Sequence, residues 1–298
     1  MDRIINILKP PNMTSHDVVG RLRRLTRIKR IGHTGTLDPM AAGVLPVCIG
    51  KSTKVIEYFE HDSKTYRCEM TLGASTDTED AWGEVLETSD LIPTEEALVE
   101  AILSFVGEID QIPPMYSALK INGQKLYDLA RQGKVVERQA RRRTIHAIDI
   151  IHVDLEKKTV LYDVKCSKGT YVRTLCHDIG LKLGCYAHMS FLMRTESGRF
   201  SLENSVTLEQ LQSNEDVLKY SQGIEEVLSY FGRIEVTETL KEKLINGVRV
   251  ELSPYIKEEG CYYKVYVDGL FIGISKKTDK GLFVDKYLYD QHQKSQVK

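Results

Sequence analysis

The chain has 298 residues, of which 42% are hydrophobic and 28% charged, and its formal net charge at pH 7 is −1. These values exclude a disordered chain and a uniformly basic nucleic-acid coat, and they allow two folded domains. No apolar run reaches the roughly 18 residues of a membrane span, and the first residues lack the plan of a signal peptide, so we expect a cytoplasmic protein without a membrane partner.

The first periodic segments are a helix and a strand. Residues 14–29 predict a helix that begins with a capping box of Thr14 and Asp17. Residues 64–73 alternate between apolar and polar side chains and predict a strand with Tyr66 on its apolar face.

Further along the chain, helices and strands alternate without a repeating βαβ rhythm. The expected elements are a helix at 94–107 that Thr94 begins and Gly107 ends, a short helix at 124–133, strands at 143–155 and 159–166, and a helix at 169–184. This order predicts an α+β fold with a mixed, mainly antiparallel sheet flanked by helices. Residues 200–232 read as helical and peripheral, and 233–298 as a small β-rich module, so we expect two domains, 1–232 and 233–298.

Charge is unevenly distributed along this nearly neutral chain. Basic residues gather at 21–30 and 138–143, whereas acidic residues crowd 77–100. Such segregation allows one positive face that meets a polyanion. For any single arginine, ordinary solvated surface charge is an equally good interpretation.

The six cysteines form no Cys-x-x-Cys pair, which argues against a zinc ribbon or a disulfide framework. Cys176, His177, Cys185 and His188 lie close together in sequence, but their spacing matches no usual zinc pattern. Cys176 falls on the apolar face of the helix expected at 169–184, where a free cysteine is usually a small buried hydrophobe. We therefore predict no metal site.

Residues 32–50, GHTGTLDPMAAGVLPVCIG, form a glycine-rich stretch with a single acid, Asp38. Two interpretations are open: an aspartate that only stabilises its own turn, or an exposed carboxylate presented to a substrate. The residues alone favour the first.

Five blocks of sequence resemble one known family. They are ILKPPNMTSHDVV (7–19), GHTGTLDPMAAGVLPVCIG (32–50), KTYRCEMTLGASTDTED (64–80), QIPPMYSALKINGQKLYDLARQG (111–133) and CSKGTYVRTLCHDIGLKLG (166–184). Together they resemble the bacterial tRNA pseudouridine-55 synthases, in that family's order. The C-terminal pieces LINGVRV and VYVDGLFIGI resemble, more weakly, a PUA domain, which is an RNA-binding β-barrel.

The resemblance implies a pseudouridine synthase fold and an active site. It makes Asp38 the catalytic aspartate, Tyr66 the aromatic residue that stacks on the target base and serves in proton transfer, and Arg173 the ion-pair partner of the aspartate. His33 would occupy the place that the flipped base leaves, and Leu192 would form part of the pocket wall. The segment FLMRTESG lacks the paired basic residues often seen after that leucine. The positions that match other pocket or RNA-contacting residues are Lys9, Lys54 and Tyr171.

The implied reaction breaks the N1–C1′ bond of a uridine and joins C5 to C1′. It exchanges no electrons or atoms with a donor, so we expect no cofactor. It needs an ionised carboxylate in a pocket that water leaves, and a buried carboxylate stays charged only beside a partner such as an arginine. We therefore expect Asp38 to be a buried charge that Arg173 compensates, in a bidentate pair.

With this resemblance, the arginine clusters become candidate phosphate contacts to the T-arm of tRNA; the residues are Arg23, Arg24, Arg27, Arg141 and Arg142. We expect a monomer that acts on tRNA alone. Two rivals stay open. One is the guide-RNA-dependent pseudouridine synthase, which shares the aspartate loop but carries extra N-terminal sequence and often a lysine-rich tail. The other is an RNA chaperone that binds tRNA without chemistry.

Overall fold

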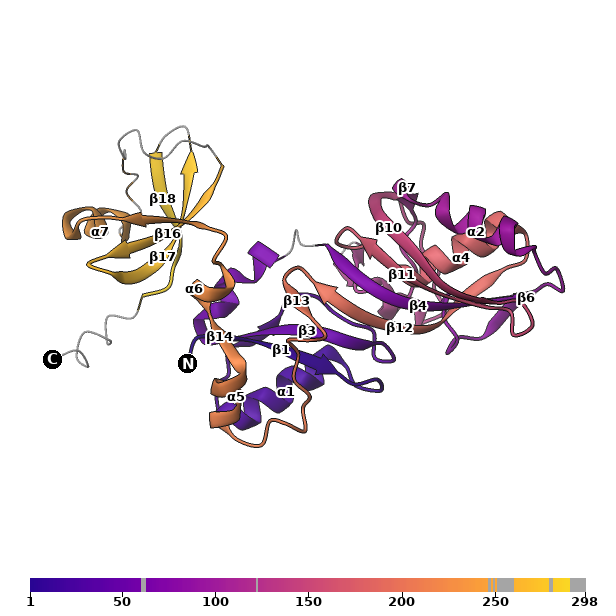
Figure 1. Ribbon diagram of the computed structural model, residues 1–298, viewed down its shortest axis with the longest axis horizontal. Helices are drawn as coiled ribbons and strands as arrows, with labels where there is room; N and C mark the ends of the chain where they lie inside the picture. Colours follow the sequence, from indigo (N-terminus) through magenta and orange to yellow (C-terminus); the bar gives the residue numbers. More distant parts are fainter. Residues whose placement is uncertain are drawn as a thin grey trace.

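The computed structural model describes residues 1–59, 63–121, 123–245, 248, 250, 260–278 and 281–289. Figure 1 shows a long twisted sheet running through the molecule and a smaller sheet at one end. Within the described residues, no helix is long and apolar enough to cross a membrane.

The long sheet has the strand order β14-β1-β3-β12-β4-β11-β10-β7, with β13 paired to β12 and β2 paired to β3. All of its strand pairs are antiparallel except β12 with β3. This confirms the predicted mixed, mainly antiparallel sheet of an α+β fold. Its strands are β1 (Arg3–Lys9), β2 (Ile31–His33), β3 (Ala42–Ile49), β4 (Lys64–Leu72), β7 (Gly107–Gln111), β10 (Arg141–Asp154), β11 (Thr159–Cys166), β12 (Ala187–Ser197), β13 (Phe200–Ser201) and β14 (Ser221–Gly223).

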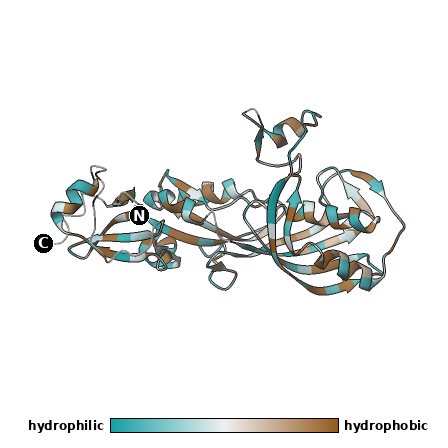
Figure 2. Ribbon diagram, turned by 90° about the horizontal axis from the view of Figure 1, so that it is seen from above, coloured by the Kyte–Doolittle hydropathy of each residue, from teal (hydrophilic) through white to brown (hydrophobic). Residues whose placement is uncertain are grey.

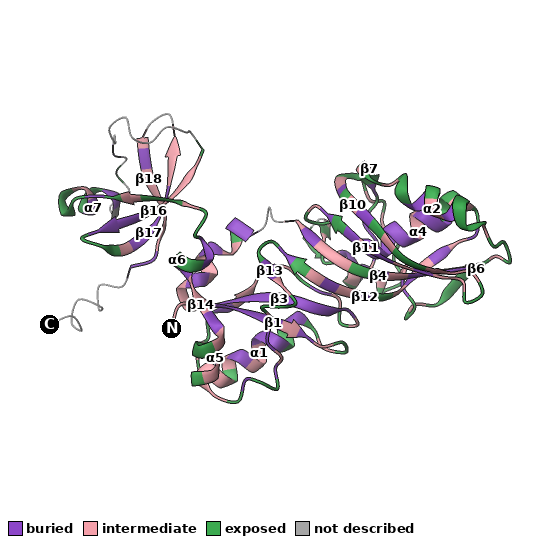
Figure 3. Cartoon of the chain, in the orientation of Figure 1, coloured by how far each residue is buried: buried purple, intermediate pink, exposed green. Residues whose placement is uncertain are grey.

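Helices cover one face of this sheet over the main hydrophobic core, and a second buried cluster, which includes Ile4, Val44 and Val227, covers the opposite face of β1 and β3. In Figure 3 the inner helix α4 and the middle strands are largely buried, while the outer helix α2 is mostly exposed. Figure 2 shows hydrophobic and hydrophilic residues alternating along the long strands, as expected where one face packs and the other meets water. The helices of the main body are α1 (Ser15–Thr26), α2 (Glu95–Leu103), α4 (Val172–Leu183), α5 (Asn214–Tyr220) and α6 (Ile224–Val227), with the 3₁₀ helix η1 (Gly50–Phe59) after β3.

The helix starts follow the capping residues read from the sequence. Helix α1 begins with the predicted box, in which Thr14 and Asp17 cap each other's backbone. It ends at Thr26, earlier than expected, because Arg27 takes a left-handed conformation with φ of 58°. The Thr94 hydroxyl caps α2 as predicted.

Two further sequence predictions were wrong. Helix α2 ends at Leu103, so Gly107 does not terminate it but begins β7, at φ of 114°. Residues 200–232 are not only peripheral helix. The short strand β14 within them forms the edge of the main sheet beside β1, and Val206 forms a bridge with Ile7.

Two smaller structures project from the main sheet. Strands β5 (Ala74–Thr76) and β6 (Val85–Thr88) form a hairpin after β4. Residues 112–140, here called the insertion, connect β7 to β10 and contain β8 (Lys120–Ile121), β9 (Gln124–Lys125) and α3 (Leu126–Ala130). The insertion has a small core of its own, built on Met115, Leu126 and Leu129.

The C-terminal part is an open sheet in the order β15-β16-β17-β18, with α7 (Glu238–Ile245) beside it. Among the described residues the two edge strands of this sheet do not pair, so the expected closed PUA-like barrel is not confirmed. Much of the matching piece LINGVRV lies outside the described residues. The strands are β15 (Gly232–Glu235), β16 (Tyr262–Val267), β17 (Leu270–Thr278) and β18 (Gly281–Tyr287).

The C-terminal sheet packs directly on the rest of the chain. Ile274 and Leu288 belong to the same buried cluster as Ile4 and Val55. The Tyr58 ring of η1 lies 4.9 Å from that of Tyr262, centroid to centroid. A shared core of this kind fixes the C-terminal sheet against η1.

Candidate active site

Asp38 stands at the tip of the loop between β2 and β3, and buried polar groups hold this loop in place. The Ser15 hydroxyl accepts a hydrogen bond from the Leu37 amide at 3.0 Å. The Lys9 ammonium donates to the Pro39 carbonyl at 3.2 Å. Gly43, at φ of 116°, passes so close to the backbone of Arg194 that a Cβ atom would lie 2.2 Å from its carbonyl oxygen. The loop therefore presents its carboxylate from a fixed backbone.

The Arg173 guanidinium lies beside that carboxylate. Its Nη2 atom is 3.3 Å from Oδ2 of Asp38, so the structure brings together two residues that are distant in sequence. Arg173 is the second residue of α4 and its side chain is only 7% exposed, whereas that of Asp38 is 42% exposed. The expectation of a buried aspartate was therefore wrong: the arginine is the buried partner, and the carboxylate reaches solvent at the loop tip.

Asp80 is a second carboxylate on the same guanidinium, and sequence reasoning missed it. Its Oδ2 atom lies 3.6 Å from Nη1 of Arg173, so the two ends of the guanidinium face two different acids rather than gripping Asp38 alone. The Thr78 hydroxyl and the Trp82 amide both donate to the other carboxylate oxygen of Asp80, at 2.6 and 3.2 Å. The segment TDTED carried the signal, since Thr78 lies two residues before Asp80 and its hydroxyl donates to that carboxylate.

The remaining contacts of Arg173 are to main-chain carbonyls. Nη2 donates to the Tyr116 carbonyl at 2.7 Å, and Nη1 to the Thr78 carbonyl at 3.5 Å. With one positive and two negative charges, the group formed by Asp38, Arg173 and Asp80 keeps a net negative charge. Asp38 is the exposed member of this group, so its carboxylate can carry that net negative charge.

A second buried arginine, Arg194, lies under the Asp38 loop and was not among the expected site residues. It is 1% exposed and donates to the carbonyls of Val44, at 2.7 Å, and Gly35, at 3.2 Å. It stands opposite Tyr66 in the register of β12 and β4. Burial raises the pKa of Tyr66 and the guanidinium of Arg194 partly opposes the rise, so this tyrosine is a neutral phenol near pH 7.

Lys9 is fully buried, which its charge in the sequence did not indicate. Its ammonium donates to three carbonyls, those of Pro10, Met13 and Pro39. Burial lowers its pKa to about 8, although the nearby Asp38 carboxylate acts in the opposite direction. Lys9 therefore joins the turn after β1 to the residue that follows Asp38.

His33 lies at the end of β2, at the start of the Asp38 loop. Its Nδ1 atom is buried and lacks a hydrogen-bond partner among the described residues. Burial lowers the pKa of His33, and the positive charge of Arg194 adds to the effect. The imidazole of His33 is therefore neutral near pH 7.

Three other expected site residues have structural contacts. The Lys54 ammonium donates to the Tyr287 carbonyl at 2.7 Å, so it joins η1 to the C-terminal sheet. Tyr171 is the N-cap residue of α4. Leu192 is 8% exposed and belongs to the main core, on the strand that also carries Arg194.

The five arginines that are candidate phosphate contacts differ in their exposure and in their partners within the protein. Arg24, Arg27 and Arg141 are exposed. Arg23 donates to the carbonyls of Lys29 and Ile31, at 3.0 and 3.4 Å, and so closes the end of α1. Arg142 lies 3.4 Å from Glu108 in an exposed ion pair.

Among the described residues, no group of three or more His, Cys, Asp or Glu side chains is arranged to hold a metal ion. The Cys176 sulfur lies in the core, 3.5 Å from that of Cys68 and 3.2 Å from the Tyr162 hydroxyl. The Nδ1 atom of His188 is hydrogen-bonded to the Ala74 carbonyl oxygen at 3.0 Å.

Comparison with known families gives two matches that together span most of the chain. The TruB family pseudouridylate synthase N-terminal domain matches residues 23–172, and the tRNA pseudouridylate synthase B C-terminal domain matches 173–230.

Curated relatives and solved structures agree with these matches. A tRNA pseudouridine synthase B from Alkaliphilus oremlandii is 48% identical and covers 92% of both chains; one from Clostridium tetani is 47% identical and covers 97% of this chain and 100% of that protein. Among solved structures, one of a Cbf5-Nop10-Gar1 complex is 26% identical with a TM-score of 0.72, covering 97% of this chain and 86% of that chain. One of an archaeal box H/ACA sRNP Nop10-Cbf5 complex is 25% identical with a TM-score of 0.69, covering 96% and 85%.

Proposed function

The chain belongs to the TruB family of pseudouridylate synthases, and from this premise we propose that it isomerises uridine-55 in the TΨC arm of tRNA to pseudouridine, as a monomer and without a guide RNA. The observation that carries the proposal is the ion pair of 3.3 Å between Asp38 and Arg173. The names of relatives that are 47–48% identical support tRNA as the substrate.

In this reaction the N1–C1′ bond breaks, C5 bonds to C1′, C5 loses its hydrogen as a proton, and N1 gains a proton. The balance needs no electron donor and no transferred group, so the catalytic groups come from side chains. Asp38 supplies the ionised carboxylate that acts as nucleophile or base. Arg173 keeps it charged while the base and sugar displace water from the loop tip.

Asp80 completes this arrangement by sharing the guanidinium. If both ends of Arg173 gripped Asp38, the carboxylate would be strongly neutralised and less reactive. Because Nη1 faces Asp80, the contact with Asp38 uses one oxygen, Oδ2. Asp38 is thus oriented by the arginine and still available to react.

Tyr66 and His33 suit the handling of an extruded base. A uridine in a folded arm must leave its stack before a protein can surround it, at a cost of a few kcal/mol. The Tyr66 ring would stack on the base, and its protonated hydroxyl is a donor near Asp38. The neutral His33 ring would fill the space that the base leaves, and Leu192 would form part of the pocket wall.

For RNA contacts outside the pocket, exposure is the guide. The exposed Arg24, Arg27 and Arg141 would meet phosphates of the arm, with smaller contributions from Arg23 and Arg142. We place the catalytic unit in residues 1–232 and a PUA-like RNA-binding unit in 233–298. Lys9 and Lys54 also belong to the proposed site: the Lys54 ammonium uses one of its three hydrogens on the Tyr287 carbonyl, and the buried Lys9 supports the pocket from within.

The test is to incubate the purified chain with an unmodified tRNA transcript carrying tritium at uridine C5 and no guide RNA. Release of tritium to water reports the new C5–C1′ bond, and mapping locates it. We expect one pseudouridine, at position 55. Asp38→Asn should abolish release while tRNA binding stays within about tenfold, and Asp154→Asn, which weakens an ion pair with Lys157 in the turn between β10 and β11, serves as the control.

The same experiment separates the rivals. A chain that binds tRNA but releases no tritium is a chaperone. A chain that becomes active only when a guide RNA is added is a guide-dependent synthase. Tritium release by the Asp38→Asn variant would refute the proposed catalytic role of Asp38.

A further inference from the structure

The insertion touches the active site through its first residues. Its own small core is separate from the main core, so the body of the insertion is not anchored by shared packing. What joins it to the site is the set of hydrogen bonds made by Gln111, the last residue of β7, and by Tyr116 near the start of the insertion.

Gln111 begins this attachment. It is 1% exposed, and its amide group donates to the Tyr171 carbonyl at 3.0 Å and accepts from the Tyr171 amide at 2.8 Å. Tyr171 is the N-cap of α4 and makes no side-chain capping bond of its own. Gln111 therefore fixes the start of the helix whose second residue is Arg173.

Tyr116 makes the closest contact to Arg173. Its carbonyl accepts from Nη2 at 2.7 Å, a shorter distance than either carboxylate makes to this guanidinium. Its hydroxyl donates to Oδ2 of Asp77 at 3.2 Å. Asp77 belongs to the turn that carries Asp80, and its other oxygen accepts from the Glu84 amide at 2.8 Å. Tyr116 is thus tied at one end to Arg173 and at the other to the Asp80 turn.

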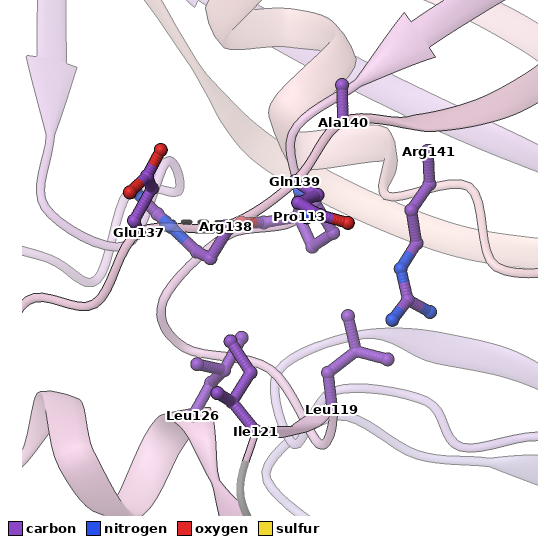
Figure 4. Close-up of a pocket in the computed structure, with 9 residues that line it drawn as sticks. All are labelled: Pro113, Leu119, Ile121, Leu126, Glu137, Arg138, Gln139, Ala140 and Arg141. Carbon is purple, nitrogen blue, oxygen red and sulfur yellow. Dashed lines mark hydrogen bonds between the residues drawn. The ribbon is translucent and has the colours of Figure 1, made fainter.

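The other side of this segment borders a cavity at Pro113. The Pro113 carbonyl accepts a bond of 3.1 Å from Arg138, which Figure 4 shows at the edge of a cavity of about 300 Å³. Leu119, Ile121 and Leu126 line the opposite wall. Met115 belongs to the small core of the insertion and Tyr116 packs against it, so packing and hydrogen bonds together set the position of this segment.

We propose that Tyr116 is a positioning residue for Arg173, and that its hydroxyl, held by Asp77, places its carbonyl so that the guanidinium spans Asp38 and Asp80. The proposal rests on the proposed function. Asp38 and Asp80, at 3.3 and 3.6 Å, hold only the two ends of the guanidinium. The Tyr116 carbonyl is a neutral acceptor on Nη2 and fixes the orientation of the guanidinium between the two acids. Because Tyr116 belongs to the insertion, RNA that shifts the insertion would shift the arginine.

The test is Tyr116→Phe, which removes the hydroxyl and keeps the ring and the carbonyl. We expect the single-turnover rate constant for tritium release to fall about three- to tenfold, the factor that one hydrogen bond contributes, with the Kd for tRNA within twofold. The matched control is Tyr127→Phe, because the Tyr127 hydroxyl bonds only Lys125 within the insertion, at 3.1 Å, among the described residues. It should react at the wild-type rate.

A double-mutant cycle with Asp77→Ala shows whether the two residues act as one unit. If they do, Tyr116→Phe slows the wild type but not the Asp77→Ala protein. Additive effects, a wild-type rate for Tyr116→Phe, or a loss that appears only in Kd would overturn the proposal. A wild type that forms no pseudouridine would instead refute the proposed function, and this inference with it.

Discussion

The buried cations of the active site and the exposed arginines at the end of α1 carry the same charge but differ in their surroundings. Arg173, Arg194 and Lys9 are buried, and each is held by several oxygen atoms of the protein. Arg24 and Arg27 are exposed beside a shallow surface hollow that Arg27 helps to line. A buried cation fixes geometry, because moving it would leave its own charge and several acceptors unpaired. An exposed one adds to a field that salt screens.

The largest expected effect is that of Arg173→Lys. A single ammonium cannot reach Asp38, Asp80 and the Tyr116 carbonyl in the geometry of a planar guanidinium, so we expect kcat to fall at least about 100-fold. The Kd for tRNA should stay within a few-fold. Tritium release and filter binding measure the two quantities. Arg24→Lys is the control. A near-normal kcat for Arg173→Lys would show that the reaction does not need the planar guanidinium at this position.

A pH effect should come from Lys9, whose pKa falls from 10.5 when unfolded to about 8 in the folded chain. Between these values the unfolded state binds more protons than the folded one, so the free energy of unfolding rises with pH. Urea unfolding from pH 7 to 10.5 should therefore show the wild type gaining stability relative to Lys9→Met as pH rises above 8. A constant difference between the two would show that burial costs this lysine nothing.

The smallest effect is expected for the exposed arginines. Arg24→Gln combined with Arg27→Gln should weaken tRNA binding about three- to tenfold at low salt, because two phosphate contacts are lost. The dependence of log K on log salt should become shallower by about one for each arginine. Arg67→Gln is the control, since Arg67 pairs with Asp163 at 2.8 Å. If the double variant kept the wild-type dependence of log K on log salt, the end of α1 would not be part of the RNA-binding surface.

Local patterns predicted much of the framework because they act over a few residues. The capping box of Thr14 and Asp17, the alternation along β4 and the hairpin of β10 and β11 are confirmed. The end of α2 was wrong because Gly107 was read as a helix stop, whereas its positive φ is used to enter a strand. The edge strand β14 was missed because three residues are too few to show a period.

The sequence by itself determined helices α1, α2 and α4, strands β4, β10 and β11, and the resemblance that assigns Asp38 and Arg173 to one site, since these follow from residue types and their order. Only the tertiary structure decided that Arg173 is the buried member of the pair, that Asp80 and Tyr116 share its guanidinium, and that Arg194 and Lys9 lie beneath the loop. The physical reason is that burial and hydrogen-bond partners depend on which distant segments meet. The charge of a residue is written in the sequence, but its surroundings are not.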